Sequence, residues 1–236
     1  MKYDYIIRGA TCYGCGMAAG LSGKVLVLEE SVVPGSDWAL GFDGGYWEEP
    51  LVTQPAIDFR EALLSHRALS EDGRVCIGAL APLMAQWCLD YKVRIEFSCN
   101  VLSHSGNIVA VMGVDGRQQY ETEHFIDARP SVFNGVKYAT GLMLFKGASL
   151  PSGVYGDFIL TPGFIEGEYY IALPVPSAEK WPGARSRFHA AWDKRPASLA
   201  NAQLQLVGVR FSYGNAPNPA AAIEYGYLWA KEVLEK

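Results

Sequence analysis

The sequence predicts an α/β fold in which a parallel sheet that carries a β-hairpin is joined to a small β-rich second region. Three observations predict it. The first thirty residues run from a strand through a glycine turn and a short helix to a second strand that ends in acidic residues. A helix pair and a hairpin pattern follow, and residues 131–200 are rich in aromatic residues and turns.

The opening segment has the order of a dinucleotide-binding βαβ unit. The β-rich run 3–7 stops at Gly9, and Gly9 and Gly14 stand at the first and third glycines of G-x-G-x-x-G. The first glycine permits a sharp turn, and the third lets the helix lie close to the strand. The apolar run 25–28 predicts a strand buried on both faces. Glu29 follows at the usual distance for a carboxylate that binds ribose hydroxyls.

The first helix is expected to be short and interrupted by Gly16 and Gly20, and its start is the expected phosphate site. It presents free N–H groups and a positive dipole end to a pyrophosphate. Thr11 occupies the position of the middle glycine. Its Cβ either pushes the ligand outward or supplies a hydroxyl in place of close backbone contact. The alternative to a dinucleotide site is an ordinary strand-turn-helix whose glycines serve packing.

The cysteines include one pair at C-x-x-C spacing, Cys12 and Cys15. A helix N-terminus lowers the pKa of a thiol, so this pair beside a redox cofactor would form a dithiol–disulfide relay. The alternative is that small side chains fill a tight turn. No second Cys or His pair stands at matching spacing, so no metal site is expected. Cys76, Cys88 and Cys99 are interpreted as core or near-core thiols.

Composition limits the class of protein. The chain has 236 residues, half of them hydrophobic, which suffices for one substantial core or a main domain with a small second one. A net charge of -5 argues against a nucleic-acid partner. No apolar stretch is long enough for a membrane span, and the chain starts directly with a strand, so no signal peptide is expected. Five cysteines without disulfide-like spacing indicate reduced thiols and a cytoplasmic location.

The middle of the chain predicts a loop, two helices and a meander of strands. Residues 31–45 are rich in glycine and cannot form a regular element, so they are expected to pass over the ligand crevice as a loop. The elements that follow are expected as helices at 57–69 and 77–91, a strand at 93–97, hairpin strands at 107–112 and 118–124, and a short apolar strand at 125–128.

The rest of the chain predicts a β-rich insertion and a closing βα unit. Strand-like segments between 131 and 174 precede an expected helix at 181–194. A strand at 204–211, a loop at 212–219 and a helix at 220–234 are expected to end the chain. We therefore expect one discontinuous domain made of 1–130 and 201–236, with 131–200 as a substrate or cap region.

This order of parts resembles FAD-dependent oxidoreductases of the glutathione-reductase-like superfamily, whose FAD-binding domain is Rossmann-like and built in two parts. The resemblance covers 1–130 and 204–236 and is carried by five segments: 9–14, 25–29, 34–45, 125–128 and 208–222. It implies FAD as the cofactor. It also implies that the final helix points its N-terminus at the flavin ring, where the dipole stabilises negative charge.

The resemblance assigns cofactor contacts to specific residues. The pyrophosphate is expected at the glycine turn, the ribose at the acidic strand end, the flavin beside the following loop and the final loop, and adenine beside the backbone of the meander. In chain order these are Gly9, Thr11, Cys12, Gly14, Glu29, Glu30, Ser36, Asp37, Gly41, Val101, Ala128, Arg129, Gly214, Asn215 and Ala216.

The sequence departs from the family pattern at three places. Thr11 replaces a glycine. Ala128-Arg129-Pro130 stands where such proteins carry Ala-Thr-Gly. Gly214-Asn215 stands where they carry Gly-Asp, and an asparagine can still bond a ribityl hydroxyl without charge. Arg8, at the end of the first strand, is expected to meet a phosphate or Asp37.

Candidate catalytic residues come from the region expected over the flavin. Arg187 would clamp a carboxylate, and His189 or Tyr213 would move a proton during hydride transfer. For each residue the alternative is a surface charge or a packed aromatic ring.

The expected function is FAD-dependent oxidation or reduction of a small molecule. Only one dinucleotide fingerprint occurs, so electrons come from the substrate, from a nicotinamide that docks transiently, or from a partner protein. One alternative is a non-catalytic FAD-binding protein or the flavin subunit of a larger oxidoreductase. A second is an NAD-linked enzyme. A homo-oligomer is compatible with the sequence, and no membrane partner is expected.

Overall fold

The computed structural model describes residues 1–132, 136–147 and 149–235. Its elements are β1 (Lys2–Arg8), α1 (Cys12–Gly20), β2 (Val25–Leu28), α2 (Ser36–Ala39), α3 (Gln54–Ser65), α4 (Ile77–Asp90), β3 (Ile95–Glu96), β4 (Asn100–Ser105), β5 (Ile108–Gly113), β6 (Gly116–Asp127), β7 (Lys137–Phe145), β8 (Gly153–Tyr155), β9 (Phe158–Pro162), β10 (Glu168–Pro174), α5 (Trp181–Asp193), β11 (Ala202–Val207), β12 (Ser212–Tyr213) and α6 (Pro219–Leu234). Short 3-10 turns lie at Pro130–Val132 and Ala197–Leu199.

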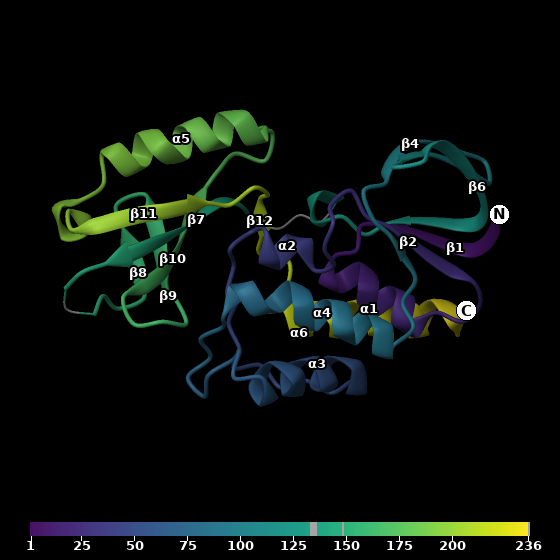
Figure 1. Cartoon of the computed structure of the whole chain (residues 1–236), viewed down its shortest axis with the longest axis horizontal. Coiled ribbons are helices and arrows are strands. Elements are labelled where there is room, and N and C mark those ends of the chain that lie inside the picture. The colour runs from purple at the N-terminus through teal and green to yellow at the C-terminus, as the bar shows by residue number, and fades with distance from the viewer. Residues whose placement is uncertain (133–135, 148, 236) are drawn as a thin grey trace.

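Two sheets divide the molecule between them (Figure 1). The first has the strand order β3-β2-β1-β6-β5-β4, and α1, α3, α4 and α6 lie together on one side of it. The second has the order β11-β7-β10-β9-β8, with β12 also paired to β7, and is covered by α5. Both chain ends lie at the end of the molecule that carries the first sheet. In the part of the chain that the structure describes, no helix is long and apolar enough to cross a bilayer.

The first sheet confirms the predicted α/β class. β1 pairs in parallel with β2 on one side, Ile7 opposite Val27, and with β6 on the other, Ile7 opposite Ile126. Ile6 and Ile7 are fully buried, as expected for the central strand of a sheet covered on both faces. The carboxyl ends of β1, β2 and β6 therefore meet at one edge, where α/β sheets bind ligands.

The meander differs from the prediction in two respects. The expected hairpin is present as β5 and β6. Residues 125–128 do not form a separate strand, because β6 runs without a break to Asp127. Its first half pairs antiparallel with β5 and its second half parallel with β1, so one strand serves both parts of the sheet. The strand β4, which pairs antiparallel with β5, was not predicted from the sequence.

The helices before the meander are close to their predicted positions. α4 matches the helix expected at 77–91, whereas α3 begins and ends earlier than expected at 57–69. Pro55 fits the first turn of α3, where its missing N–H costs no hydrogen bond. Arg67, with φ +54°, marks the turn that follows the helix. The loop expected at 31–45 contains a one-turn helix, α2, so that prediction was wrong at 36–39.

The second sheet and α5 have a core of their own. α5 matches the helix expected at 181–194 and buries Ala184, Phe188 and Trp192. Phe188 and Trp192 both contact the ring of Phe158 from β9. β11, expected to begin the return to the first domain, pairs antiparallel with β7 in this second sheet. The division of the chain into two domains at residue 201 stays a prediction.

α1 and α6 pack with their backbones in close contact. A Cβ on Gly16 would lie 2.1 Å from the carbonyl oxygen of Ile223, and a Cβ on Gly226 would lie 2.0 Å from that of Tyr13. Gly20 is also close to α6, at Tyr227 and Ala230. Gly16 and Gly20 were expected to interrupt α1. Instead they lie within a regular helix and let α6 pack against its backbone.

Replacing Gly226 with alanine is expected to lower the free energy of unfolding by about 1–3 kcal/mol, because the added methyl would overlap the Tyr13 carbonyl. Gly78 is the matched control, since it is an exposed helical glycine with nothing within 4 Å of an added Cβ. Alanine there should leave stability unchanged or raise it by up to about 1 kcal/mol. Urea denaturation followed by circular dichroism measures both changes. Equal effects at the two positions would contradict the close approach.

Candidate functional site

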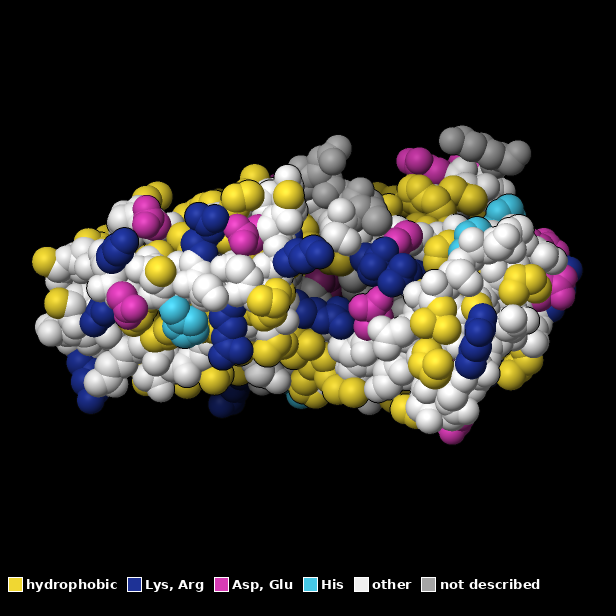
Figure 2. Space-filling model, turned by 90° about the horizontal axis from the view of Figure 1, so that it is seen from above, with side chains coloured by type: hydrophobic (Ala, Val, Ile, Leu, Met, Phe, Trp, Pro, Cys, Tyr) yellow, Lys and Arg dark blue, Asp and Glu magenta, His cyan; other side chains and the backbone are white. Residues whose placement is uncertain are grey.

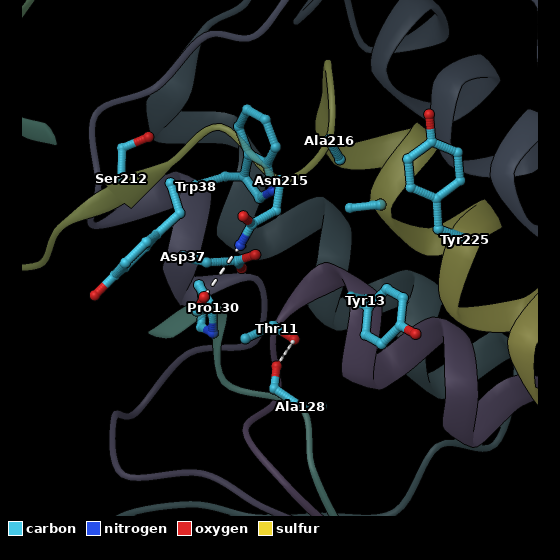
Figure 3. A pocket seen from close by; sticks show the side chains of 12 residues that line it. Thr11, Tyr13, Asp37, Trp38, Ala128, Pro130, Ser212, Asn215, Ala216 and Tyr225 are labelled. Carbon is cyan, nitrogen blue, oxygen red and sulfur yellow. Dashed lines mark hydrogen bonds between the residues drawn. The ribbon is translucent and has the colours of Figure 1, made fainter. Parts of the chain in front are cut away.

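A pocket lies where the first strands of the sheet end. It opens between the N-termini of α1 and α6, α2, the end of β6 and the strand β12 (Figure 3). Backbone turns, polar side chains and aromatic rings from distant parts of the chain line it: Thr11, Tyr13, Asp37, Trp38, Ala128, Pro130, Ser212, Tyr213, Asn215, Ala216, Ala222 and Tyr225. The pocket is therefore at the carboxyl edge of a parallel sheet, the usual ligand position in this class of fold.

The side chain of Thr11 closes the glycine turn beside the pocket. Gly9 turns the chain with φ +104°, a conformation that favours glycine. The hydroxyl of Thr11 accepts a hydrogen bond from the amide of Gly14 at 2.9 Å and donates one to the carbonyl of Ala128 at 3.0 Å (Figure 3). Thr11 is 2% exposed, so the substitution for glycine acts as the N-cap of α1 and its hydroxyl is already bonded.

The acid at the end of β2 is held rigidly. Glu29 is 1% exposed, and its carboxylate accepts hydrogen bonds from the amides of Ala10 and Ser31, both at 2.8 Å. The guanidinium of Arg210 lies 3.1 Å from the same carboxylate. A buried carboxylate needs such partners, because desolvation without them is costly. Glu29 thus joins the glycine turn, the loop after β2 and the segment before β12.

Arg210 lies beside the pocket and was not predicted from the sequence. It comes from the segment between β11 and β12, and it also donates to the hydroxyl of Ser36 at 3.0 Å. Ser36 in turn donates to Glu29 at 3.3 Å. These contacts join residues far apart in the chain, and a single arginine in a loop carries no local pattern that would have revealed them. Trp38, Tyr13, Tyr225 and Ser212 were missed for the same reason.

Asp37 lies on the N-terminus of α1. Its carboxylate accepts a hydrogen bond from the amide of Cys12 at 3.2 Å. Burial raises the pKa of Asp37 to about 7, the nearby charge of Glu29 also raises it, and Arg210 and the Cys12 amide lower it. The position expected for a phosphate oxygen thus holds a carboxylate from the chain itself.

The remaining charges near the pocket are paired within the described residues. Arg129 forms a two-point ion pair with Asp127, its shortest distance being 2.6 Å. Arg8 pairs with Glu30 at 2.8 Å, so the expectation that it meets Asp37 was wrong. A second hollow, lined in part by Glu30, Asp37, Arg129 and Arg210, adjoins the pocket. Figure 2 shows Lys and Arg side chains beside Asp and Glu side chains around a hollow at the middle of one face.

The final loop brings a second helix N-terminus to the pocket. The amide nitrogen of the Asn215 side chain donates to the carbonyl of Pro130 at 3.1 Å (Figure 3). Ala216 lines the pocket, and Asn218 caps α6 by accepting from Ala221 at 2.9 Å. Gly214 has open space around it. Ala222 and Tyr225, from the first two turns of α6, line the same pocket as Thr11 and Tyr13 at the start of α1, so both helices begin beside one space.

The structure brings together only some of the candidate residues. Thr11, Asp37, Ala128, Asn215 and Ala216 line the pocket with Tyr213, whose pKa burial raises. The turn beside the pocket contains Gly9, Cys12 and Gly14, and Glu29 is bonded to it. The adjoining hollow is lined in part by Glu30 and Arg129.

Other candidates lie elsewhere. Gly41 and Val101 do not line the pocket, and Val101 lies in the meander. Arg187 and His189 are exposed on α5, where Arg187 pairs with Glu179 at 2.9 Å. They miss the pocket because the helical period turns Ala184, Phe188 and Trp192 to the core, which leaves the intervening residues in solvent.

The cysteine pair does not have the expected electrostatics. Burial, and then the charge of Asp37, raises the pKa of Cys12 well above its usual value. A hydrogen bond with Cys88, and then burial, raises the pKa of Cys15 in the same way. The predicted lowering by the helix N-terminus was therefore wrong. Cys88 and Cys99 are buried and Cys76 is half-buried, as predicted.

A further pocket lies against the second sheet. Phe42, Asp43, Tyr138, Thr140 and Tyr170 contribute to its lining. Asp43 accepts hydrogen bonds from the hydroxyl of Ser212, which lines the first pocket, and from the amide of Gly45. The Asp43–Ser212 contact therefore separates two neighbouring pockets. Among the described residues, no group of three His, Cys, Asp or Glu side chains is placed to hold a metal ion.

Comparisons with known proteins find likeness only in fold. No protein-family model and no curated protein matches the chain. CabE, an aromatic hydroxylase from angucycline biosynthesis, is similar with a TM-score of 0.59 at 12% identity, over 100% of this chain and 63% of CabE. Glycine oxidase from Bacillus cereus is similar with a TM-score of 0.57 at 15% identity, over 99% and 95% of the two chains.

The myxobacterial chondrochloren halogenase CndH, an FAD-dependent halogenase, is similar with a TM-score of 0.55 at 12% identity, over 98% of this chain and 72% of that one. This chain spans 63% of the length of CabE and of the anhydrotetracycline hydroxylase OxyS from Streptomyces rimosus. At such identities the likeness shows the fold, and the narrower resemblance to glutathione reductase stays a prediction.

Glu29→Gln is expected to lower the free energy of unfolding by about 2–4 kcal/mol, because it leaves Arg210 without its charge partner and turns an amide N–H toward a backbone donor. Glu30→Gln is the neighbouring control. Glu30 pairs with Arg8 at the surface, so its loss should cost less than about 1 kcal/mol. Urea denaturation at pH 7 measures both. A cost as small for Glu29 as for Glu30 would contradict the buried network.

The native thiols of Cys12 and Cys15 are expected to react with Ellman's reagent at pH 8 at least about tenfold more slowly than that of Cys76. The reason is that burial and raised pKa values leave few thiolates at these two positions. Partial labelling followed by peptide mass spectrometry identifies the modified residue, and unfolded protein serves as the reference. Preferential labelling of Cys12 or Cys15 would restore the dithiol hypothesis.

Proposed function

We propose that this chain is an FAD-dependent oxidoreductase that acts on a small molecule by hydride transfer at the flavin. One observation carries the proposal: the N-termini of α1 and α6 open onto a single pocket at the carboxyl edge of β1, β2 and β6. One such helix end suits a pyrophosphate, and a second suits a ring that becomes negative on reduction. Similar folds in an aromatic hydroxylase, a glycine oxidase and an FAD-dependent halogenase support it.

The residues present suit FAD at most of its expected contacts. The turn from Gly9 to Gly14 and the first amides of α1 would hold the pyrophosphate. Glu29 lies at the end of β2, beside the turn, where a carboxylate would meet the ribose. Asn215 and Ala216 line the pocket in front of α6 and would lie along the ribityl chain and the ring. Val101 would meet adenine through its backbone. Three amides of the turn already have partners in the chain: Ala10 bonds to Glu29, Cys12 to Asp37 and Gly14 to Thr11.

FAD, when bound, supplies the ring that accepts or gives up a hydride. The chain's own residues would set the surroundings of that ring. The dipole of α6 favours negative charge in front of Asn218. Tyr213 lines the pocket, and burial raises its pKa further above neutrality, so its hydroxyl is available as a hydrogen-bond donor to a reacting molecule. Trp38 lines the same pocket and would limit the entry of water.

The pocket that lies against the second sheet supports a small-molecule substrate. It lies against β7 and β10 of the second sheet, and the Asp43–Ser212 contact separates it from the first pocket. Its lining mixes the rings of Phe42 and Tyr138 with the hydroxyl of Thr140. A substrate there would have apolar surface with a few polar groups to orient it. Arg187 and His189, exposed on α5, are not part of this proposal.

A flavin-binding subunit or non-catalytic FAD protein is the second candidate. The observation that favours it is the altered glycine turn, whose amides at Ala10, Cys12 and Gly14 already bond to the chain itself. Bleaching of bound FAD by a small molecule without any partner protein would decide for the enzyme.

An NAD-linked enzyme is a third candidate. An NAD-binding domain would not require the chain to return through α6 to the first helix, so this return argues against it. A cytoplasmic location and a homo-oligomeric state stay predictions of the sequence.

FAD is expected to bind the purified protein and give it the yellow colour of a flavin. Ala216→Glu should weaken binding at least about tenfold, because it places a negative charge in the pocket in front of α6. Gln119→Glu, which makes the same charge change on the exposed meander, should leave the dissociation constant within about twofold. Quenching of flavin fluorescence gives both constants. A protein that stays colourless and binds no added FAD would overturn the proposal.

A further inference from the structure

We propose that Asp37 is an internal anion of the dinucleotide site, which holds the phosphate-binding end of α1 until the carboxylate is protonated or withdrawn. The inference rests on the proposed function, because it concerns the same pocket. It adds a regulatory step: a pyrophosphate must replace a group of the chain itself, so binding becomes coupled to a proton.

Three donors of the glycine turn already have oxygen partners from the chain. The amide of Cys12 donates to Asp37 at 3.2 Å, that of Gly14 to Thr11 at 2.9 Å, and that of Ala10 to Glu29 at 2.8 Å. Two of these acceptors, Thr11 and Glu29, are fixed in place, because both are buried and each makes a further hydrogen bond. Asp37 differs from them, because it is only half-buried and lines both the pocket and the adjoining hollow.

The position of Asp37 is set by two contacts of the backbone. Gly35, which begins α2 in a left-handed conformation with φ +65°, donates its amide to the carbonyl of Ala10 at 2.7 Å. Gly41 allows a close return, since a Cβ there would lie 2.3 Å from the carbonyl oxygen of Asp37. α2 is a single turn between these two points. A rotation of the Asp37 side chain is therefore enough to free the Cys12 amide, with no rearrangement of the sheet.

The charges around Asp37 make its titration relevant near neutrality. The groups that face it are Glu29 and Glu30 after β2, Cys12 and Cys15 of α1, Arg129 after β6, and Arg210 and Tyr213 from the end of the chain. The two arginines are held by other carboxylates, Arg129 by Asp127 and Arg210 by Glu29. Asp37 thus has no dedicated cation among the described residues. Burial first, and Glu29 to a lesser extent, raise the pKa of Asp37 to about 7 against the opposing effects of backbone hydrogen bonds and of Arg210.

The sign of the pH dependence follows from this charge. Above pH 7 Asp37 is mostly ionised and repels a pyrophosphate, and below pH 7 it is mostly neutral. If only the protonated form admits the ligand, about 3% of the protein is competent at pH 8.5 and about 90% at pH 6, for a pKa of about 7. The dissociation constant of FAD, whose pyrophosphate keeps its charge over this range, should therefore rise about thirtyfold from pH 6 to pH 8.5.

The test compares the wild-type protein with two variants and a control. Asp37→Asn keeps the shape and the acceptor for the Cys12 amide but removes the charge, and Asp37→Ala removes both. Asp115→Asn makes the same charge change in an exposed turn. FAD dissociation constants are measured from pH 6 to pH 8.5 by fluorescence quenching. Inorganic pyrophosphate is titrated into each protein at pH 8.5 by calorimetry, since this probe tests the helix end without FAD.

The expected result is that both Asp37 variants bind FAD with little dependence on pH and bind pyrophosphate at least about tenfold more tightly than the wild type at pH 8.5. The Asp115 variant should behave as the wild type. Equal pyrophosphate affinity in wild type and both variants would overturn the inference, as would pH-independent binding of FAD to the wild type. Failure of every protein to bind FAD, with pyrophosphate still favouring the Asp37 variants, would overturn the proposed function and keep the inference.

Discussion

The backbone contact between α1 and α6 is the constraint on which the site depends. Glycines at 16 and 226 remove the side chains that would separate the two helices, so a carbonyl of each lies where the other's Cβ would be. This approach fixes the last helix against the first, although the second sheet intervenes between them in sequence. The first turns of both helices then lie beside one pocket. A pair of ordinary side chains at this contact would displace α6 and with it the front of the pocket.

Much of the fold could be predicted because its signals are local. The βαβ order, the helix at 77–90 and the hairpin follow from apolar periodicity and turn residues within short windows. The errors arose where tertiary contacts override local preference. β6 continues through 125–127 because β1 pairs with it, and Gly16 and Gly20 remain helical because α6 covers them. β11 joins the second sheet because β7 offers it an edge, which no local pattern reveals.

The site divides in the same way between local and long-range features. Gly9, Gly14 and Glu29 could be recognised from spacing alone, and the structure brings them to one turn. The hydrogen-bond and ion-pair partners of this turn and of Glu29 could not be foreseen. They are Arg210, Asp37 and the carbonyl of Ala128, which are distant in sequence. The thiols of the C-x-x-C pair show the limit of a local rule: a helix N-terminus lowers a thiol pKa, but complete burial beside Asp37 and Cys88 outweighs it. The turn thus has the sequence pattern of a dinucleotide-binding motif, but its amides at Ala10, Cys12 and Gly14 are bonded to oxygens of the chain itself.

The central claim is that FAD lies between the N-termini of α1 and α6. A crystal structure of the protein grown at pH 6 with excess FAD tests it most directly. The account predicts electron density for the pyrophosphate at the amide of Cys12, with Asp37 turned away, and for the flavin ring in front of Ala216. A structure at the same FAD excess in which Asp37 still bonds Cys12 and no density for FAD is present in the pocket would contradict it.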